Sequence, residues 1–193
     1  MKKNILFVIL IMIFGLNVKA QNGLTAGSTA PTFSGIDQNG KKITLKNLVK
    51  EHQSVVLFFY RGQWCPYCNK QIKELQDSLQ LLTNKDAFVV GVTPETNENI
   101  EKTIKKTKAG FSIIQDKDDQ IMKAYGVNFM MDDATFTKYK GYGIDLEANN
   151  GNSRHTLPVP ATYIITRSGK IKYVHFDPNY KKRASISTLI AEL

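Results

Sequence analysis

The chain has 193 residues, of which 42% are hydrophobic, and its formal net charge is +9. These values predict one globular domain that buries a full core without disulfide staples. The 26 lysines and arginines are scattered and form no run of five or more, which argues against a nucleic-acid-binding patch.

The first twenty residues have the layout of a secretory signal peptide. Two lysines precede an apolar run from Ile5 to Leu16, and small residues precede a cut after Ala20. The run is too short for a membrane span, which needs roughly twenty residues. We therefore expect cleavage of residues 1–20, loss of three of the +9 charges, and a periplasmic or secreted protein. The alternative is an uncleaved N-terminal anchor, which would be the only contact with a membrane.

Residues 21–30 are small and polar and are predicted to be a flexible lead-in to a domain over residues 31–193. Turn residues at 37–40 predict a hairpin into residues 42–45, and Asn47 is expected to cap a short helix.

Apolar and β-branched runs predict the strands of the domain, and apolar residues three and four apart predict its helices. The predicted strands cover residues 55–60, 88–93, 111–115, 161–166 and 170–176. The predicted helices cover residues 65–82, 95–108, 118–125 and 185–193. Residues 127–156 have no clear period and are predicted to be a long loop. Because helices alternate with strands, we expect an α/β fold with a central mixed sheet covered by helices on both faces.

The chain has only two cysteines, Cys65 and Cys68, and they stand where a buried strand leads into a helix. Free backbone N–H groups and the helix dipole favour a thiolate at that position, and the thiolate is the reactive form of cysteine. We expect Cys65, at the helix N-terminus, to be the nucleophile and Cys68 to be the resolving thiol that closes a redox-active Cys65–Cys68 disulfide. Pro66 suits the first helical turn.

Other roles for the two cysteines fit the sequence less well. A structural disulfide would close a very short loop and contribute little stability. A zinc site needs four ligands, and no second pair of cysteines or closely spaced histidines completes the set, so we expect no metal and no cofactor.

A second motif, Leu157–Ile165, places prolines directly before a predicted strand. A cis Val159–Pro160 bond would turn backbone polar groups toward the cysteines; an ordinary trans bond is the alternative, and Pro158 is the weaker candidate. We expect Pro160 to shape a substrate groove. The groove residues are predicted to be Trp64, Pro66, Tyr67, Val159 and Pro160.

The two motifs together resemble the thioredoxin-like fold. The segment Phe59–Cys68, the turns at 39–41 and 167–170, and the stretch from Leu157 to Tyr180 resemble the peroxiredoxin-like branch of the alkyl hydroperoxide reductase/thiol-specific antioxidant (AhpC/TSA) family. The resemblance covers roughly residues 24–193. It implies a thioredoxin-like domain with thiol redox chemistry.

The chain departs from the pattern of the peroxiredoxins in this family. They have a proline and a threonine seven and three residues before the reactive cysteine, where this chain has Phe58 and Gly62. Their active-site arginine, which with the threonine polarises the peroxide, corresponds to Pro160 here. Arg61 is a candidate assisting charge, although we expect it at the surface.

We therefore expect a thiol–disulfide oxidoreductase that acts on protein disulfides. The first alternative is a peroxiredoxin-like peroxidase that reduces hydroperoxides with electrons from a thioredoxin-like donor. The second is a non-catalytic binding module that kept the fold. A buried acid often assists such thiols, and Glu51, Glu74 and Asp116 are equal candidates for it.

Overall fold

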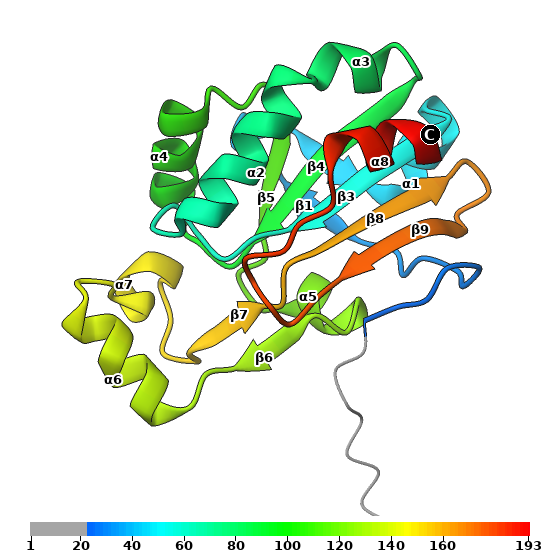
Figure 1. Ribbon diagram of the computed structural model, residues 1–193. Coiled ribbons are helices and arrows are strands. Elements are labelled where there is room, and N and C mark those ends of the chain that lie inside the picture. Colours follow the sequence, from blue (N-terminus) through cyan, green and yellow to red (C-terminus); the bar gives the residue numbers. More distant parts are fainter. Residues whose placement is uncertain (1–22) are drawn as a thin grey trace, which may run out of the picture.

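The computed structural model describes residues 23–193, so the predicted signal peptide and the cut after Ala20 lie outside the described residues. The centre of the fold is a five-stranded sheet. Its strands are β3 (Ser54–Phe59), β4 (Ala87–Thr93), β5 (Ser112–Gln115), β8 (Ala161–Thr166) and β9 (Ile171–Phe176). The spatial order is β5-β4-β3-β8-β9, with β3, β4 and β5 parallel and β8 and β9 antiparallel to their neighbours (Figure 1). The predicted mixed α/β sheet is confirmed.

One face of the sheet is covered by the helix that follows the cysteines and by its neighbouring helices. They are α2 (Pro66–Asp77), α3 (Leu79–Thr83), α4 (Asn97–Thr107) and α8 (Ile186–Glu192). The prediction of one helix over residues 65–82 was wrong, because the chain leaves helical geometry at Ser78, with φ −105° and ψ 8°. The apolar stripe continues across this break, since Ile72, Leu75 and Leu82 are all buried against the sheet.

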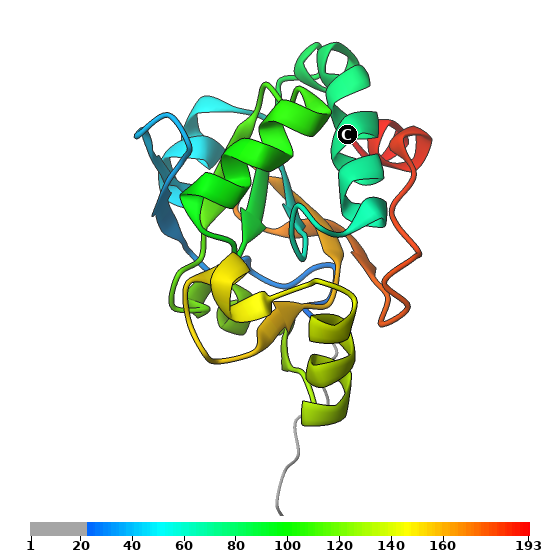
Figure 2. The ribbon, with the colours of Figure 1, turned by 90° about the vertical axis from the view of Figure 1, so that its left-hand side faces the viewer.

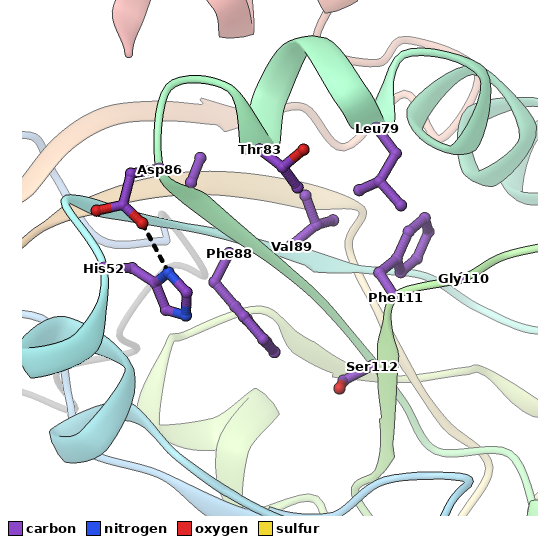
Figure 3. Close-up of a pocket in the computed structure, with 10 residues that line it drawn as sticks. His52, Leu79, Thr83, Asp86, Phe88, Val89, Gly110, Phe111 and Ser112 are labelled. Carbon is purple, nitrogen blue, oxygen red and sulfur yellow. Dashed lines mark hydrogen bonds and ion pairs between the residues drawn. The ribbon is translucent and has the colours of Figure 1, made fainter.

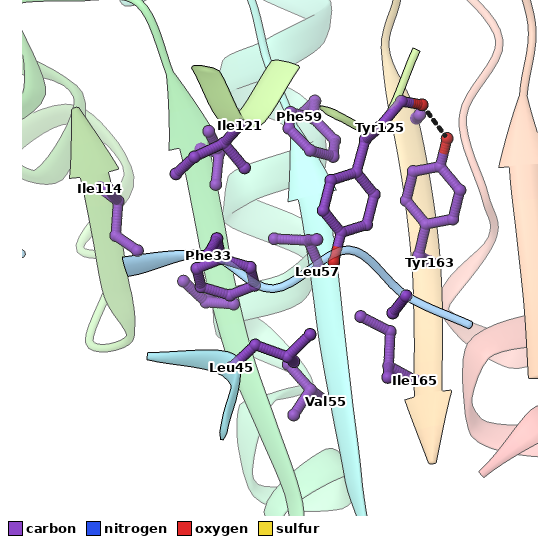
Figure 4. Close-up of a cluster of buried hydrophobic side chains, with 14 of the residues drawn as sticks. Phe33, Leu45, Val55, Leu57, Phe59, Ile114, Ile121, Tyr125, Tyr163 and Ile165 are labelled. Atoms are coloured by element: carbon purple, nitrogen blue, oxygen red, sulfur yellow. Dashed lines mark hydrogen bonds between the residues drawn. The ribbon is translucent and has the colours of Figure 1, made fainter. Parts of the chain in front are cut away.

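The opposite face of the sheet packs on a hairpin and two short helices. The hairpin pairs β1 (Ser34–Ile36) with β2 (Lys42–Thr44), and the helices are α1 (Leu45–Glu51) and α5 (Gln120–Ala124). Thr44, not Asn47, caps α1, because its hydroxyl accepts the backbone N–H of Asn47. Figure 4 shows the core on this face, where aromatic rings from β3, α5 and β8 meet.

Residues 127–156, predicted to be a loop, are mostly ordered into short elements. These are β6 (Asn128–Met130), α6 (Asp133–Gly141) and α7 (Leu146–Asn150), and β7 (Thr156–Pro158) pairs with β6. No residue of α6 is buried, so the helix has no apolar stripe that a periodicity argument could detect. We call residues 128–158 the helical insert; Figures 1 and 2 show it at the end of the sheet where α2 begins.

The helical insert is tied to the domain by a buried carboxylate. Asp119, at the start of α5, is fully buried and pairs with Arg154 Nε at 2.8 Å. The hydroxyl of Thr156 donates to the same carboxylate, also at 2.8 Å. These contacts hold the returning strand of the insert against the domain.

Residues 23–30, predicted to be a flexible lead-in, run along the turn between β8 and β9. Gly27 N donates to Ile171 O at 2.8 Å and Ala30 N donates to Gly169 O at 2.9 Å. This segment is therefore hydrogen-bonded into the domain. Within residues 23–193, no helix has the length and apolar content that crossing a membrane requires.

Candidate active site

The two cysteines lie at the carboxyl end of β3, where the chain enters α2. All six residues of β3 are buried, and the loop after it delivers Cys65 to the N-cap of α2, with Pro66 in the first turn. Cys65 Sγ accepts the backbone N–H of Cys68 at 3.3 Å. Both cysteines are free thiols and both are buried. The predicted strand–helix junction is therefore present, with one helical turn between the sulfurs.

The electrostatic surroundings differ between the two thiols. Burial raises the pKa of Cys68, but a hydrogen bond from the Cys65 thiol and the positive charge of Arg183 outweigh it and bring that pKa to about 6. Arg183 Nη2 lies 3.7 Å from Cys68 Sγ. The hydrogen bond to Cys68, together with burial, raises the pKa of Cys65. The Cys65 thiol thus donates a hydrogen bond to Cys68, and this bond and the charge of Arg183 favour ionisation of Cys68 over ionisation of Cys65.

This arrangement corrects the expectation that Cys65 has the lower pKa. The expectation rested on the helix N-terminus alone, which acts through the N–H that Cys65 accepts. The guanidinium of Arg183 comes from the segment before α8, 115 residues further along the chain. No local pattern around the cysteines could have indicated it.

Arg61 is buried at the site and does not lie on the surface as predicted. Its side chain sits over two rings, 4.6 Å from the centroid of Tyr180 and 5.2 Å from that of Phe129. Its Nη1 donates to the hydroxyl of Tyr139 at 3.5 Å, and its Nε is buried without a hydrogen-bond partner. Within residues 23–193, Arg61 forms no ion pair. It is a desolvated cation held by aromatic faces.

A buried acid lies beside the cysteines, and it is none of the three candidates. Glu95 is fully buried after β4, and its carboxylate accepts the backbone N–H of Gln63 at 2.5 Å and the hydroxyl of Thr103 at 3.4 Å. Burial raises the pKa of Glu95 to about 8, and the negative charge of Cys68 acts in the same direction.

The position of Glu95 in the sequence, two residues after the end of β4, is a signal for this placement. A carboxylate two residues past a buried strand lies at the same edge of a parallel sheet as the cysteines. Of the earlier candidates, Glu51 and Glu74 are exposed. Asp116 is buried but accepts the backbone N–H groups of Ile121 and Met122 at the start of α5.

Cys65 opens onto a small pocket that is almost entirely apolar apart from one cation. The pocket has a volume of about 180 Å³. Three predicted groove residues line it, together with Cys65, Arg61, Tyr180 and side chains of the helical insert. The groove residues are Trp64, Pro66 and Tyr67, and the insert contributes Tyr139, Tyr142 and Ile144. We call this the Cys65 pocket.

Val159 and Pro160 do not line the Cys65 pocket, so their place in a substrate groove stays a prediction. The Val159–Pro160 bond is trans, and Val159 N donates to Val127 O at 2.7 Å. The segment thus pairs with the chain that leads into the helical insert. Side chains of the insert, and not Pro160, line the pocket at Cys65.

A separate pocket of about 220 Å³ lies at the opposite end of the sheet, between the first residues of β4 and β5 (Figure 3). Its walls are mainly apolar, with Leu79, Phe88 and Phe111 among them. The two ionisable side chains that line it form a hydrogen bond with each other, with His52 Nδ1 and Asp86 Oδ1 2.9 Å apart. Within residues 23–193, no three histidine, cysteine or acidic side chains are grouped to hold a metal ion. The reactive groups therefore gather at the Cys65 end of the sheet.

Comparison with known proteins identifies the family to which the sequence is similar. Residues 26–174 match the profile of the AhpC/TSA family. The chain is 27% identical over 152 residues to peroxiredoxin Q of Sedum lineare, across 79% of this chain and 69% of that protein. It is 30% identical over 106 residues to peroxiredoxin Bcp of Escherichia coli, across 55% of this chain and 67% of that protein. Two rice relatives are longer, and the chain spans 59% of their length.

The solved structures show the same fold. The peroxidoxin BcpB structure from Mycobacterium tuberculosis superposes with a TM-score of 0.66 at 18% identity, covering 86% of this chain and 94% of that one. The thioredoxin-like arrangement expected from the sequence is thereby confirmed.

Proposed function

The chain belongs to the AhpC/TSA family and is an oxidoreductase, and from that premise we propose that it is a thiol peroxidase whose reacting groups are Cys65 and Cys68. One observation carries the proposal: Cys65, one of two neighbouring free thiols, lines a small pocket that also contains the buried guanidinium of Arg61. This places a nucleophile, a proton acceptor and a positive charge around one small space. The proposal departs from the reductase acting on protein disulfides that the sequence favoured.

The first half-reaction uses the proton of the Cys65 thiol. Transfer of that proton from Cys65 to Cys68 creates a thiolate at Cys65, the sulfur that lines the pocket. This thiolate attacks the terminal oxygen of a hydroperoxide ROOH, the O–O bond breaks, and the leaving alkoxide takes the proton from Cys68 to become ROH, which leaves Cys68 as a thiolate. Cys65 is left as a sulfenic acid, with two electrons passed to the peroxide.

The second half-reaction closes the disulfide. Cys68, as its thiolate, attacks the sulfur of the Cys65 sulfenic acid; the S–O bond breaks and the hydroxide leaves as water after protonation. A dithiol protein, or two molecules of a small thiol, then supplies two electrons and two protons to restore both thiols. A thioredoxin-like protein suits that role, because relatives of this chain are named peroxiredoxins.

Arg61 supplies positive charge at the oxygen where charge develops. The family's peroxide-polarising arginine corresponds to Pro160 in this chain. A positive charge beside the peroxide must therefore come from another residue. Arg61 lines the Cys65 pocket and forms no ion pair within residues 23–193 that would neutralise it. A fixed cation in an apolar pocket stabilises a developing negative charge more strongly than it would in water.

A disulfide reductase remains the second candidate, and a specific observation favours it. Gly62 stands where the family has its threonine, so no hydroxyl is available there to bind a peroxide. The Cys-Pro-Tyr-Cys pair at a helix N-terminus is equally suited to exchange with a protein disulfide.

Stopped-flow mixing of the reduced protein with hydrogen peroxide and with an alkyl hydroperoxide separates the two candidates. We expect the fluorescence of Trp64, the only tryptophan, to change as Cys65 is oxidised, far faster than a simple thiol reacts. Cys68→Ser should accumulate a sulfenic acid that dimedone traps, and Cys65→Ser should not. Oxidation no faster than that of a simple thiol would exclude the peroxidase and leave the reductase.

The reduction potential of the Cys65–Cys68 pair then tests the source of electrons. A value near −270 mV, similar to that of thioredoxin, supports a pair that a thioredoxin-like donor can keep reduced. A value near −120 mV would instead indicate a disulfide donor.

We also propose that the enzyme acts outside the cytoplasm, because residues 1–20 have the layout of a signal peptide. N-terminal sequencing of the protein recovered from its source should begin at Gln21. Recovery of the intact N-terminus from a membrane fraction would support the anchor instead.

A further inference from the structure

A second pocket adjoins the Cys65 pocket on the other side of Tyr67. It has a volume of about 300 Å³, and Tyr67 lines both pockets. Three cations and one carboxylate contribute to its walls. The polar residues of this basic pocket are Tyr67, Lys70, Gln71, Glu74, Lys181, Arg183 and Ser185.

Two of the three cations in the basic pocket have no carboxylate partner. Lys70 Nζ lies 3.8 Å from Glu74 and is largely compensated by it. Within residues 23–193, neither Lys181 nor Arg183 forms an ion pair. Lys181 Nζ stands 6.0 Å from the centroid of the Tyr67 ring, and the Nε of Arg183 is buried without a hydrogen-bond partner. The basic pocket therefore carries a net positive charge next to the reacting sulfurs.

The charge of this pocket changes with the redox state of the cysteines. Arg183 Nη2 points at Cys68 Sγ from 3.7 Å, so the Cys68 thiolate is the negative charge nearest to it. When Cys68 joins Cys65 in a disulfide, that negative charge disappears. The oxidised protein thus presents an uncompensated guanidinium to the basic pocket, and the reduced protein does not.

We propose that the basic pocket binds the carboxylate of a small thiol that reduces the Cys65–Cys68 disulfide, and that it holds this carboxylate more tightly in the oxidised state. The inference rests on the proposed function only in taking the disulfide as the oxidised form of the enzyme. The two pockets meet at Tyr67, so one molecule can place its sulfur at Cys65 and its carboxylate at Lys181 and Arg183. The size of the pocket suits a small molecule, and opposite charges favour the encounter.

Two molecules of the small thiol reduce the Cys65–Cys68 disulfide in two steps. The thiolate of the small thiol attacks Cys65 Sγ, the Cys65–Cys68 bond breaks, and Cys68 leaves as a thiolate against Arg183. A second molecule of the thiol attacks the mixed disulfide, which releases Cys65 and one oxidised disulfide of the small thiol. Two electrons enter the protein, and the two thiol protons remain available to the cysteines. The restored Cys68 thiolate neutralises Arg183, so the carboxylate is released.

The test uses the disulfide form made with diamide, so that it does not depend on any reaction with peroxide. Its reduction is followed by Trp64 fluorescence with 3-mercaptopropionate, 2-mercaptoethanol and cysteamine, each rate being divided by the thiolate concentration. We expect the anionic thiol to react fastest and the cationic thiol slowest. The advantage should shrink as salt is added, because these charges are partly exposed to solvent.

A matched pair of lysine variants locates the effect. Lys181→Gln should lower the ratio of the rates for the anionic and neutral thiols by about 2- to 5-fold, as expected for one partly exposed charge. Lys182→Gln is the control, because Lys182 pairs with Asp177 at 3.4 Å and does not line the basic pocket.

Three outcomes would overturn the inference without touching the peroxidase proposal. These are equal rates for the three thiols, a ratio that Lys181→Gln leaves unchanged, and equal effects of the two lysine variants. Fast reduction by a thioredoxin-like protein, with slow and charge-independent reduction by the small thiols, would indicate a protein donor instead. Failure of the enzyme to react with peroxide, with the thiol preference intact, would overturn the peroxidase and keep the basic pocket.

Discussion

On the α1/α5 face of the central sheet, buried hydroxyls find partners: the hydroxyl of Tyr125 donates to Pro31 O at 2.9 Å, and that of Tyr163 donates to Tyr125 O at 3.3 Å (Figure 4). Within residues 23–193, buried polar atoms without a partner include Tyr60 Oη and Asn69 Oδ1 on the α2/α8 face and Asp119 Oδ1 at the start of α5. Four others belong to residues that line the Cys65 pocket or the basic pocket. They are Arg61 Nε, Trp64 Nε1, Gln71 Oε1 and Arg183 Nε.

This difference suggests separate roles for the two faces of the sheet: the α1/α5 face stabilises the fold, and the α2/α8 face surrounds the cysteines. A buried polar atom without a partner costs about 1–3 kcal/mol, so four such atoms are not retained for stability. In the proposed peroxidase and in its proposed reduction, a bound peroxide or thiol would use their hydrogen bonds and charge. Changes on the α1/α5 face should therefore alter stability, and changes on the α2/α8 face should alter chemistry.

The largest expected effect is on the α1/α5 face, from Phe59→Ala. Phe59 is fully buried, and its ring packs against those of Tyr125 and Tyr163, 5.4 and 6.1 Å away between centroids. Removing it leaves a cavity and should lower the free energy of unfolding by about 3–5 kcal/mol. Urea unfolding gives this value, and the ultraviolet absorbance of the thiolate gives the thiol pKa, which should not change. A shifted thiol pKa would show that the two faces are not independent.

The next largest effect concerns Glu95, through the pH dependence of stability. A carboxyl whose pKa is about 8 in the folded protein stays protonated there, whereas in the unfolded chain it ionises near its ordinary value. The folded state therefore loses stability as pH rises between these two pKa values. Glu95→Gln removes this loss, so the variant should gain about 2–3 kcal/mol relative to the wild type between pH 6 and pH 9.

Unfolding in urea at several pH values measures this difference for Glu95→Gln. Glu98→Gln is the control, because Glu98 lies on the exposed first turn of α4. A difference between wild type and Glu95→Gln that stays constant with pH would mean that Glu95 is ionised in the folded protein.

Arg61→Met should slow the reaction of Cys65 with peroxide without lowering the free energy of unfolding. Methionine has a similar length and no charge, so replacing a buried cation that has no counter-ion should leave stability equal or higher. The rate of Cys65 oxidation by peroxide should fall about 10-fold or more, as for loss of one group that stabilises developing charge. Arg167→Met, at an exposed turn, is the matched control. An unchanged rate would remove Arg61 from the proposed mechanism.

The sequence predicted the α1/α5 face better than the site, for a physical reason. Strands such as β3 are continuous apolar runs, and the hairpin before α1 has turn residues, so local patterns identify them. Arg183 reaches Cys68 from a segment 115 residues away, and Arg61 is covered by Phe129 and Tyr139 of the helical insert and by Tyr180 near the C-terminus. The insert itself escaped prediction because α6 has no buried residue. The groups that tune the cysteines thus depend on packing between distant segments, which periodicity does not report.

The smallest expected effect is that of Tyr163→Phe, which removes only one hydrogen-bonded hydroxyl from the α1/α5 face. That hydroxyl donates to Tyr125 O and accepts the backbone N–H of Leu24, each at 3.3 Å. Its loss should lower the free energy of unfolding by about 1 kcal/mol, the usual net value of such bonds. The peroxide rate should stay the same in stopped-flow measurements, since this hydroxyl faces away from the cysteines across the sheet. Tyr173→Phe is the control and should change neither quantity, because the Tyr173 hydroxyl forms no hydrogen bond within residues 23–193. A slower reaction with peroxide in Tyr163→Phe would mean that the satisfied face of the sheet also positions the thiols, and the division between the two faces would fail.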